Sequence, residues 1–260
     1  MQAAAFDELA SVYDARFTDT PLGIALRALV WTRFDLAFSR TRCVLDLGCG
    51  TGEDAIHLAL RGTRVLAVDA SPLMLRVAQE KARQRGCADH IEFCCLPLER
   101  LAEVLSGRSF DGVLSNFGAL NCVANLPAVV GDLAASLESG ARLVLVFLGR
   151  YVPWEWFWYL SRGDPRRAWR RLQGRTQWRG VDVGYPMPAE IARMLQPSCR
   201  IDSVRALGFV MPPSYAAGWL NRRPRLLGAL ARAERLAQQL PLLASCADHY
   251  IIEATRLPVR

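Results

Sequence analysis

Short strand-like runs alternate with helical segments through the middle of the 260-residue chain, and this order constrains the fold more than any other feature. Helical periodicity separates the runs, for example over residues 53–62, 71–86 and 125–138. Alternation of this kind predicts a doubly wound α/β domain with a parallel sheet and right-handed crossovers. The five predicted strands are RCVLDL (42–47), RVLAVDAS (64–71), IEFCC (91–95), FDGVLSN (110–116) and RLVLVFL (142–148).

Local signals set the boundaries of these elements. Gly62 is a suitable C-cap for the first helix, while Ser71 and Pro72 supply an N-cap and a first helical residue for the second. Ser139 and Gly140 predict a turn before the fifth strand.

The flanking segments extend one domain over residues 1–260, whose core is residues 41–149. Residues 1–40 form a helical arm, with helices expected over 3–13 and about 22–38. The strand–helix order stops at an insertion over residues 150–186 and resumes over 187–260. That last part predicts a helix at 188–195, a strand at 200–209, a helix over 213–239 and a strand at 248–255.

Composition supports a folded chain, with 52% hydrophobic and 22% charged residues. The first residues lack an uninterrupted apolar stretch and predict neither a signal peptide nor a transmembrane helix, so a cytoplasmic protein is expected. The eight cysteines form no CxxC pair, which argues against a zinc site or a disulfide framework.

The sequence VLDLGCGTGED places Gly48, Gly50 and Gly52 between a strand and a helix, where a ligand meets the carboxyl edge of a sheet. A dinucleotide fingerprint requires a third glycine at the position of Glu53, and no Gly-Lys-Ser/Thr of a phosphate loop follows. Asp69 ends the second strand about 20 residues later, where a carboxylate accepts hydrogen bonds from ribose hydroxyls. The expected ligand therefore carries a ribose.

The segments VLDLGCGTG and VLAVDASPLML together resemble the first two motifs of class I S-adenosylmethionine-dependent methyltransferases, and the resemblance covers about residues 6–148. It implies a seven-stranded sheet of order 3-2-1-4-5-7-6, with DHYIIEAT as an antiparallel seventh strand. It also implies a cofactor site formed by Tyr13, Asp46, Gly48, Cys49, Gly50, Gly52, Asp69, Ala70, Leu98, Glu99, Ser115 and Asn116. Phe117 follows at the implied methyl-transfer pocket, in the sequence SNFG.

One position leaves part of this assignment open. Pro97 stands where the family often has an acidic residue, which leaves the adenine contact open. His57 and His249 are expected to be structural, since neither is placed at the carboxyl end of a strand. No catalytic base is identified, although a hydroxyl acceptor requires one.

The insertion contains five of the seven tryptophans, and seven arginines lie between Arg162 and Arg179. We expect a mobile lid over the pocket, with Trp154 and Trp158 contacting an apolar acceptor; contact with a membrane surface stays open. A solvated basic face is the simpler interpretation of the arginines.

These features favour methyl transfer from S-adenosylmethionine to a small, largely apolar or aromatic metabolite, such as a natural-product or quinone-like acceptor, and no metal is expected. RNA is the alternative substrate, because residues 151–260 carry 17 basic and 8 acidic side chains. A cofactor-binding partner subunit without transfer activity is the third possibility.

Overall fold

The computed structural model describes residues 2–216 and 218–258, which form a seven-stranded mixed sheet of order β3-β2-β1-β4-β5-β9-β8. This is the predicted order, and the predicted antiparallel seventh strand is confirmed because β9 runs antiparallel to both β5 and β8. The strands are β1 (Cys43–Leu47), β2 (Arg64–Asp69), β3 (Ile91–Cys95), β4 (Phe110–Ser115), β5 (Leu137–Leu148), β8 (Cys199–Leu207) and β9 (His249–Arg256).

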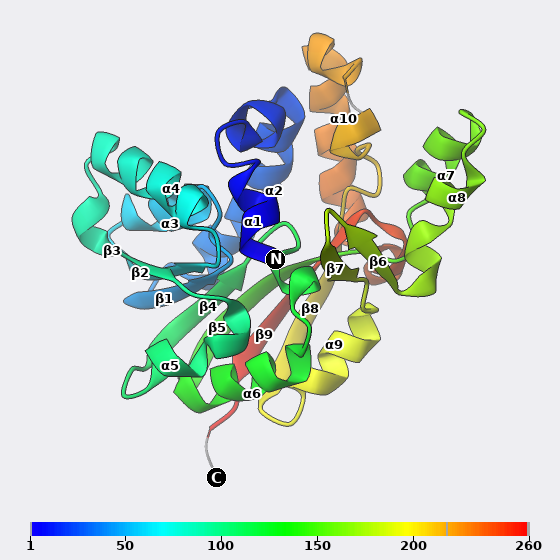
Figure 1. Cartoon of the computed structure of the whole chain (residues 1–260). Helices are drawn as coiled ribbons and strands as arrows, with labels where there is room; N and C mark the ends of the chain where they lie inside the picture. The colour runs from blue at the N-terminus through cyan, green and yellow to red at the C-terminus, as the bar shows by residue number, and fades with distance from the viewer. Residues whose placement is uncertain (1, 217, 259–260) are drawn as a thin grey trace.

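Helices cover both faces of the sheet (Figure 1). One face carries α2 (Pro21–Ala37), α3 (Glu53–Ala59), α4 (Pro72–Gln84) and α10 (Pro224–Ala237); the other carries α5 (Ala102–Leu105), α6 (Leu126–Ser136) and α9 (Pro188–Leu195). The alternation of side chains along β1 feeds both cores. Val44 packs on the α2 and α3 side, whereas Leu45 and Leu47 pack on the α6 and α9 side.

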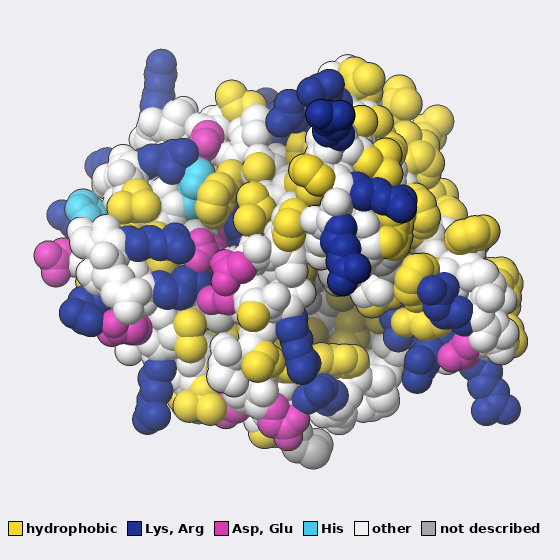
Figure 2. All heavy atoms as spheres, turned by 90° about the horizontal axis from the view of Figure 1, so that it is seen from above, with side chains coloured by type: hydrophobic (Ala, Val, Ile, Leu, Met, Phe, Trp, Pro, Cys, Tyr) yellow, Lys and Arg dark blue, Asp and Glu magenta, His cyan; other side chains and the backbone are white. Residues whose placement is uncertain are grey.

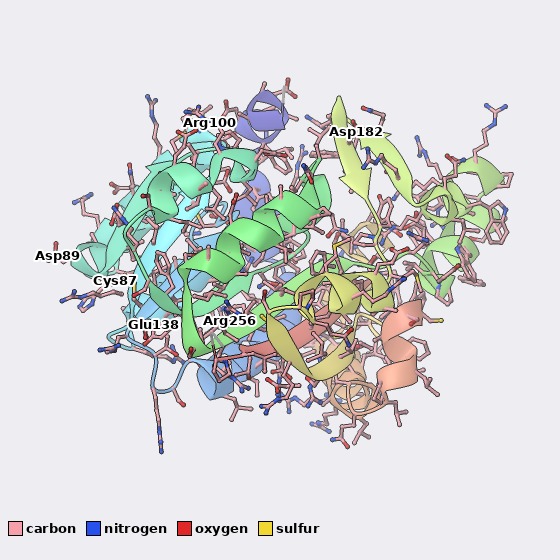
Figure 3. The ribbon with its side chains drawn as sticks, turned by 90° about the horizontal axis from the view of Figure 1, so that it is seen from below. Cys87, Asp89, Arg100, Glu138, Asp182 and Arg256 are labelled. Atoms are coloured by element: carbon pink, nitrogen blue, oxygen red, sulfur yellow. The ribbon has the colours of Figure 1, made fainter. Side chains whose placement is uncertain are left out.

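The antiparallel direction of β9 decides which of its ends meets the ligand-binding edge. Leu148, at the carboxyl end of β5, pairs with His249, the first residue of β9. The last residue of β9, Arg256, lies instead at the opposite edge with Glu138, as Figure 3 shows from below. Arg256 fixes that edge by donating to the carbonyl oxygens of Ala134 and Ser198.

Three predicted elements differ in the structure. The first arm helix, α1 (Gln2–Asp7), is shorter than the predicted 3–13, and a π-helix over Asp14–Thr18 precedes α2. The predicted turn at 139–140 is an irregularity inside β5, where the register with β4 shifts and Gly140 has φ +84°. The helix predicted from 213 begins only at Pro224, because proline favours a helix start and restricts the residue before it.

Residues 150–186 are folded rather than irregular. They contain α7 (Pro153–Leu160), α8 (Pro165–Ala168) and a hairpin of β6 (Arg175–Trp178) and β7 (Val181–Gly184). Arg179 and Gly180 form the hairpin turn with φ values of +48° and +79°, as a type I′ turn requires. The segment lies beside the end of β5, at the carboxyl edge of the sheet (Figure 1).

Candidate active site

The three glycines after β1 have different surroundings, although all have positive φ. A Cβ at Gly48 would lie 2.2 Å from Ala119 Cβ, and one at Gly52 would lie 2.7 Å from Ala78 Cβ. Those two glycines are required by packing against neighbouring elements. A Cβ at Gly50 would meet nothing within 4 Å, so this residue exposes its backbone to open space.

Asp69, at the end of β2, holds the glycine turn in place. Its Oδ2 accepts a hydrogen bond from Gly50 N at 2.8 Å, and its Oδ1 accepts one from Ser71 N at 2.9 Å. Burial raises the pKa of Asp69 above its ordinary value, although both backbone donors act to lower it. The predicted pairing of Gly50 with Asp69 at one site is therefore present in the structure.

A cavity of about 630 Å³ lies at this edge of the sheet. Its size is within the range of small-molecule sites. The N-terminal arm, the glycine turn, the loop after β4 and the β6–β7 hairpin all contribute to its wall. The lining residues on which the assignments below depend are Tyr13, Gly50, Asp69, Asn116, Phe117, Trp178 and His249.

The loop after β4 is held by buried side chains. Ser115 donates from Oγ to Leu47 O at 2.8 Å, and Asn116 donates from Nδ2 to Asp54 Oδ2 at 2.9 Å. Phe117 follows with φ +49°, a left-handed conformation that is costly for an aromatic residue. Phe117 lines the cavity, at the place where its sequence position predicted it.

A buried ion pair lies behind the glycine turn. Arg27 Nη1 is 2.8 Å from Asp54 Oδ2, and Trp31 Nε1 donates to Asp54 Oδ1 at 2.7 Å. A small recess of about 30 Å³ opens beside this pair and is lined also by Cys49 and Asn116. It shares part of its wall with the main cavity.

Asp46 is 1% exposed, and within the described part of the chain its Oδ2 has no hydrogen-bond partner. Burial raises the pKa of Asp46 well above its ordinary range, and the nearby carboxylates of Asp54 and Asp69 raise it further. An unsatisfied carboxyl of this kind is expensive in a folded protein, and such groups concentrate at ligand sites. Asp46 does not line either cavity among the residues described.

The N-terminal arm closes one side of the cavity and is tied to the core by two aspartates. Asp7 Oδ1 accepts from Ser71 Oγ at 2.6 Å, while Asp14 accepts from Thr51 Oγ1 at 2.7 Å and from Lys81 Nζ at 2.8 Å. Tyr13 lies between them in the cavity wall, and burial raises its pKa.

The residues predicted near an adenine are divided by the structure. Ala70 and Leu98 line the cavity. Glu99 is not among the described residues that line the cavity. Its Oε1 instead accepts a hydrogen bond from Ala124 N at 3.0 Å. Pro97 begins the short 3-10 helix that carries Leu98.

In the insertion, Trp154 donates from Nε1 to Phe209 O at 3.1 Å, and Trp158 stacks with Arg162, whose guanidinium carbon is 3.3 Å from the ring centroid. Neither tryptophan is among the described residues that line the cavity, so their predicted substrate contact gains no support from position. The hairpin supplies Trp178 instead, beside Tyr185. The hairpin that carries Trp178 had not been predicted from the sequence.

The insertion is anchored by buried charges. Arg171 Nη2 lies 2.9 Å from Asp248 Oδ1, and Arg171 Nε lies 2.8 Å from Glu155 Oε2. Glu155 also accepts from Arg170 Nε at 2.7 Å and from Tyr215 Oη at 3.0 Å. This network connects α7 and the following residues to the start of β9.

The two histidines differ in position. His57 lies on α3 outside both cavities, stacked on Trp31 with its Nε2 2.7 Å from Asp35 Oδ1. His249 lines the main cavity, because the amino end of an antiparallel strand meets the carboxyl edge of its parallel neighbours. The predicted antiparallel seventh strand already contained this signal.

Residues 2–216 and 218–258 contain no group of three or more His, Cys, Asp or Glu side chains arranged to hold a metal ion. In the same described part, none of the helices combines the length and the apolar character needed to cross a bilayer.

Residues 44–140 match the family model of the methyltransferase domain. The chain is 35% identical over 146 residues to the demethylmenaquinone methyltransferase of Thermus thermophilus, covering 54% of this chain and 63% of that protein, which is less than two thirds of its length. It is 29% identical to the tRNA 5-carboxymethoxyuridine methyltransferase of Escherichia coli, covering 66% of this chain and 69% of that one.

Among solved structures, the CcbJ methyltransferase of Streptomyces caelestis shares the fold with a TM-score of 0.64, at 18% identity, over 99% of this chain and 100% of its own. The strand order, and the contact between the glycine turn and Asp69, are consistent with this shared fold. Residues 44–140 therefore match a methyltransferase domain, and the chain as a whole has the Rossmann-like fold of the methyltransferases.

Proposed function

We propose that this protein transfers the methyl group of S-adenosylmethionine to a small, largely apolar or aromatic acceptor. The observation that carries the proposal is the continuity of one cavity from Gly50 and Asp69 to the aromatic hairpin. The open space at Gly50 suits a ligand backbone contact, and Asp69 beside it suits a ribose. Cofactor and acceptor would then occupy neighbouring parts of a single enclosed site.

The residues present fit the cofactor in separate parts of the site. Asp69 would hold the ribose, while Ala70 and Leu98 would flank the adenine. The recess beside Arg27 and Asp54 would take the charged amino-acid end. When bound, the cofactor supplies a methyl group already activated by the sulfonium charge, so the protein's task is alignment and exclusion of water.

The acceptor part of the cavity is aromatic. Phe6 and Trp178 pack with ring centroids 5.5 Å apart, and Phe17 meets Phe117 edge to face at 4.8 Å. All four line the cavity, and such a wall favours a flat apolar molecule. The similarity to a demethylmenaquinone methyltransferase, whose name indicates a quinone-type acceptor, supports the same class.

RNA remains a second candidate for two reasons. The name of the Escherichia coli relative indicates a tRNA substrate, and in this chain basic side chains are concentrated beside exposed aromatic ones. Figure 2 shows the Lys and Arg side chains interleaved with hydrophobic ones over α10 and the insertion. Part of that charge has internal partners, since Arg170 and Arg171 pair with Glu155. The cavity is therefore the stronger indication.

The test is transfer of labelled methyl groups to a panel of phenols and quinols, with transfer RNA assayed in parallel. Trp178→Ala should weaken acceptor binding several-fold and leave cofactor affinity unchanged, because Trp178 lines the cavity. Trp219→Ala is the matched control: it too is a part-exposed tryptophan beside an arginine, but it lies outside the described cavity wall.

Transfer to transfer RNA alone would move the assignment to the second candidate. Cofactor binding without transfer to any acceptor would favour a non-catalytic partner subunit.

A further inference from the structure

His249 lies in the wall of the proposed acceptor site, beside Phe117 of the proposed methyl-transfer pocket. Its ring meets Phe117 edge to face, with centroids 5.6 Å apart. Phe117 is the second residue after β4, and it lines the cavity together with Asn116. His249 is 7% exposed, so its ring is shielded from bulk water while still lining the cavity.

One nitrogen of the ring faces a carboxylate at ion-pair distance, although the two atoms do not have hydrogen-bond geometry. His249 Nδ1 lies 3.2 Å from Asp248 Oδ2, and the other oxygen of Asp248 accepts from Arg171 Nη2 at 2.9 Å. Burial alone would raise the pKa of Asp248, but His249 and Arg171 together hold it below its ordinary value. The carboxylate therefore stays ionised beside Nδ1, where its charge favours a proton on that nitrogen and an unprotonated Nε2.

The charged and titratable groups around His249 come from several elements. Asp248 precedes it in the chain, Arg171 reaches Asp248 from the insertion, and Arg27 of α2 lies 4.9 Å from the centre of the Phe117 ring. Tyr13 of the arm and Asp54 of α3 lie near Arg27. The carboxylate of Asp248 therefore lies next to the imidazole. Arg171 contacts that carboxylate and Arg27 contacts the Phe117 ring, so neither arginine is described in contact with His249 itself.

Other side chains of the described cavity wall suit proton removal less well. Burial raises the pKa of the Cys122 thiol to about 11, and it raises the pKa of Tyr13 and of Tyr215. Asp69 is committed to the amides of Gly50 and Ser71. An imidazole oriented by a carboxylate is the arrangement that general-base catalysis near neutral pH commonly uses.

We propose that His249 is the general base of the reaction and that the acceptor is a hydroxyl compound, such as a phenol or an enol. This inference rests on the proposed methyltransferase function. Nε2 takes the hydroxyl proton while the oxygen forms a bond to the methyl carbon. The carbon–sulfur bond breaks, its electron pair goes to sulfur, and the products are the methyl ether, the demethylated cofactor and protonated His249, which then releases its proton to solvent. Asp248 acts as a positioning residue for the ring.

The experiment compares His249→Gln with wild type on two phenols, one protonated at the assay pH and one nitro-substituted phenol that is already ionised. With the protonated phenol, kcat/KM should fall by about 10²- to 10⁴-fold, the usual contribution of a general base. With the ionised phenol the loss should be several-fold at most, since no proton has to be removed. In His249→Gln, transfer to the protonated phenol should then rise with pH as the phenol itself ionises.

Two variants control for structural effects. His57→Gln removes the other buried carboxylate-paired imidazole of the described chain, outside the cavity, and should retain wild-type transfer to both phenols. Asp248→Asn keeps His249 but removes its orienting charge, and should slow the protonated phenol more than the ionised one. Calorimetric titration with S-adenosylmethionine verifies that each variant keeps its cofactor site.

Equal losses on both phenols in His249→Gln and in Asp248→Asn would overturn the base role, as would an unchanged rate with the protonated phenol. If wild type transfers to neither phenol and to no other acceptor, the proposed function itself fails. These outcomes are distinguishable, because the first requires an active wild-type enzyme.

Discussion

At the scale of single residues, Asp46 is a buried carboxyl that lowers the stability of the fold. It is buried, one of its oxygens has no partner among the described residues, and its pKa is raised well above the ordinary value by burial and by Asp54 and Asp69. Ionisation of Asp46 therefore costs more free energy in the folded protein than in the unfolded chain. The penalty is absent below the ordinary pKa and grows as the pH rises toward the folded value.

Asp46→Asn should therefore increase the melting temperature at neutral pH, because it removes the buried charge and keeps the shape. The gain should shrink as the pH falls toward 4, where wild-type Asp46 is protonated in both states. Thermal unfolding of both proteins between pH 4 and 8 tests this. A melting temperature lowered by the substitution at every pH would show that the carboxylate is satisfied and stabilising.

At the scale of elements, the link between β8 and α10 depends on one carboxylate. Glu234 of α10 has no exposed surface and accepts hydrogen bonds from the backbone amides of Gly208, Phe209, Val210 and Met211. These four amides follow β8 at the binding edge of the sheet. Glu234 thus attaches the loop of residues 208–211 to α10.

Glu234→Ala should lower the free energy of unfolding by about 3 kcal/mol or more, since unsatisfied buried donors cost roughly 1–3 kcal/mol each. Urea unfolding measures the change. Glu80→Ala, on the exposed face of α4, removes a glutamate of the same size and should change stability little. Equal effects of the two substitutions would contradict the role of Glu234.

The sequence predicts the elements whose signals are local and leaves out those that depend on tertiary contacts. Glycine spacing and the position of Asp69 predicted that Gly50 and Asp69 lie together, and apolar runs predicted the strands, whose order followed from the family resemblance. The early end of α1 was not predictable, because Asp7 and Asp14 are tied to Ser71, Thr51 and Lys81 by folding. The pocket role of Trp178 required knowledge of the hairpin, whereas that of His249 needed only the direction of β9.

At the scale of the whole molecule, charge is divided between two regions. Residues 151–260 hold 17 of the 32 basic side chains but only 8 of the 25 acidic ones. In Figure 2 most of the acidic side chains lie over the left half of the view, and few lie near α10 and the insertion. A basic region of this kind attracts anions in general and does not by itself select RNA.

The small-molecule function predicts that Arg166→Ala combined with Arg167→Ala leaves methyl transfer to phenols unchanged, since both arginines are exposed and outside the described cavity wall. Arg76→Ala on α4 is the control for a lost surface charge. Filter binding of transfer RNA at several salt concentrations gives the rival result. A steep salt dependence that flattens by about 0.7 in slope for each lost phosphate contact would support RNA as the substrate.

The most direct measurement of the central claim is calorimetric titration of S-adenosylmethionine into wild type, Gly50→Val and Gly62→Val. Gly50 and Gly62 both have positive φ and open space at the Cβ position, so both substitutions impose a similar backbone cost. Only Gly50 lines the cavity. We predict that Gly50→Val abolishes measurable binding in a folded protein, while Gly62→Val binds as wild type does. Wild-type affinity in Gly50→Val, or equal losses in both variants, would contradict a cofactor site at the glycine turn.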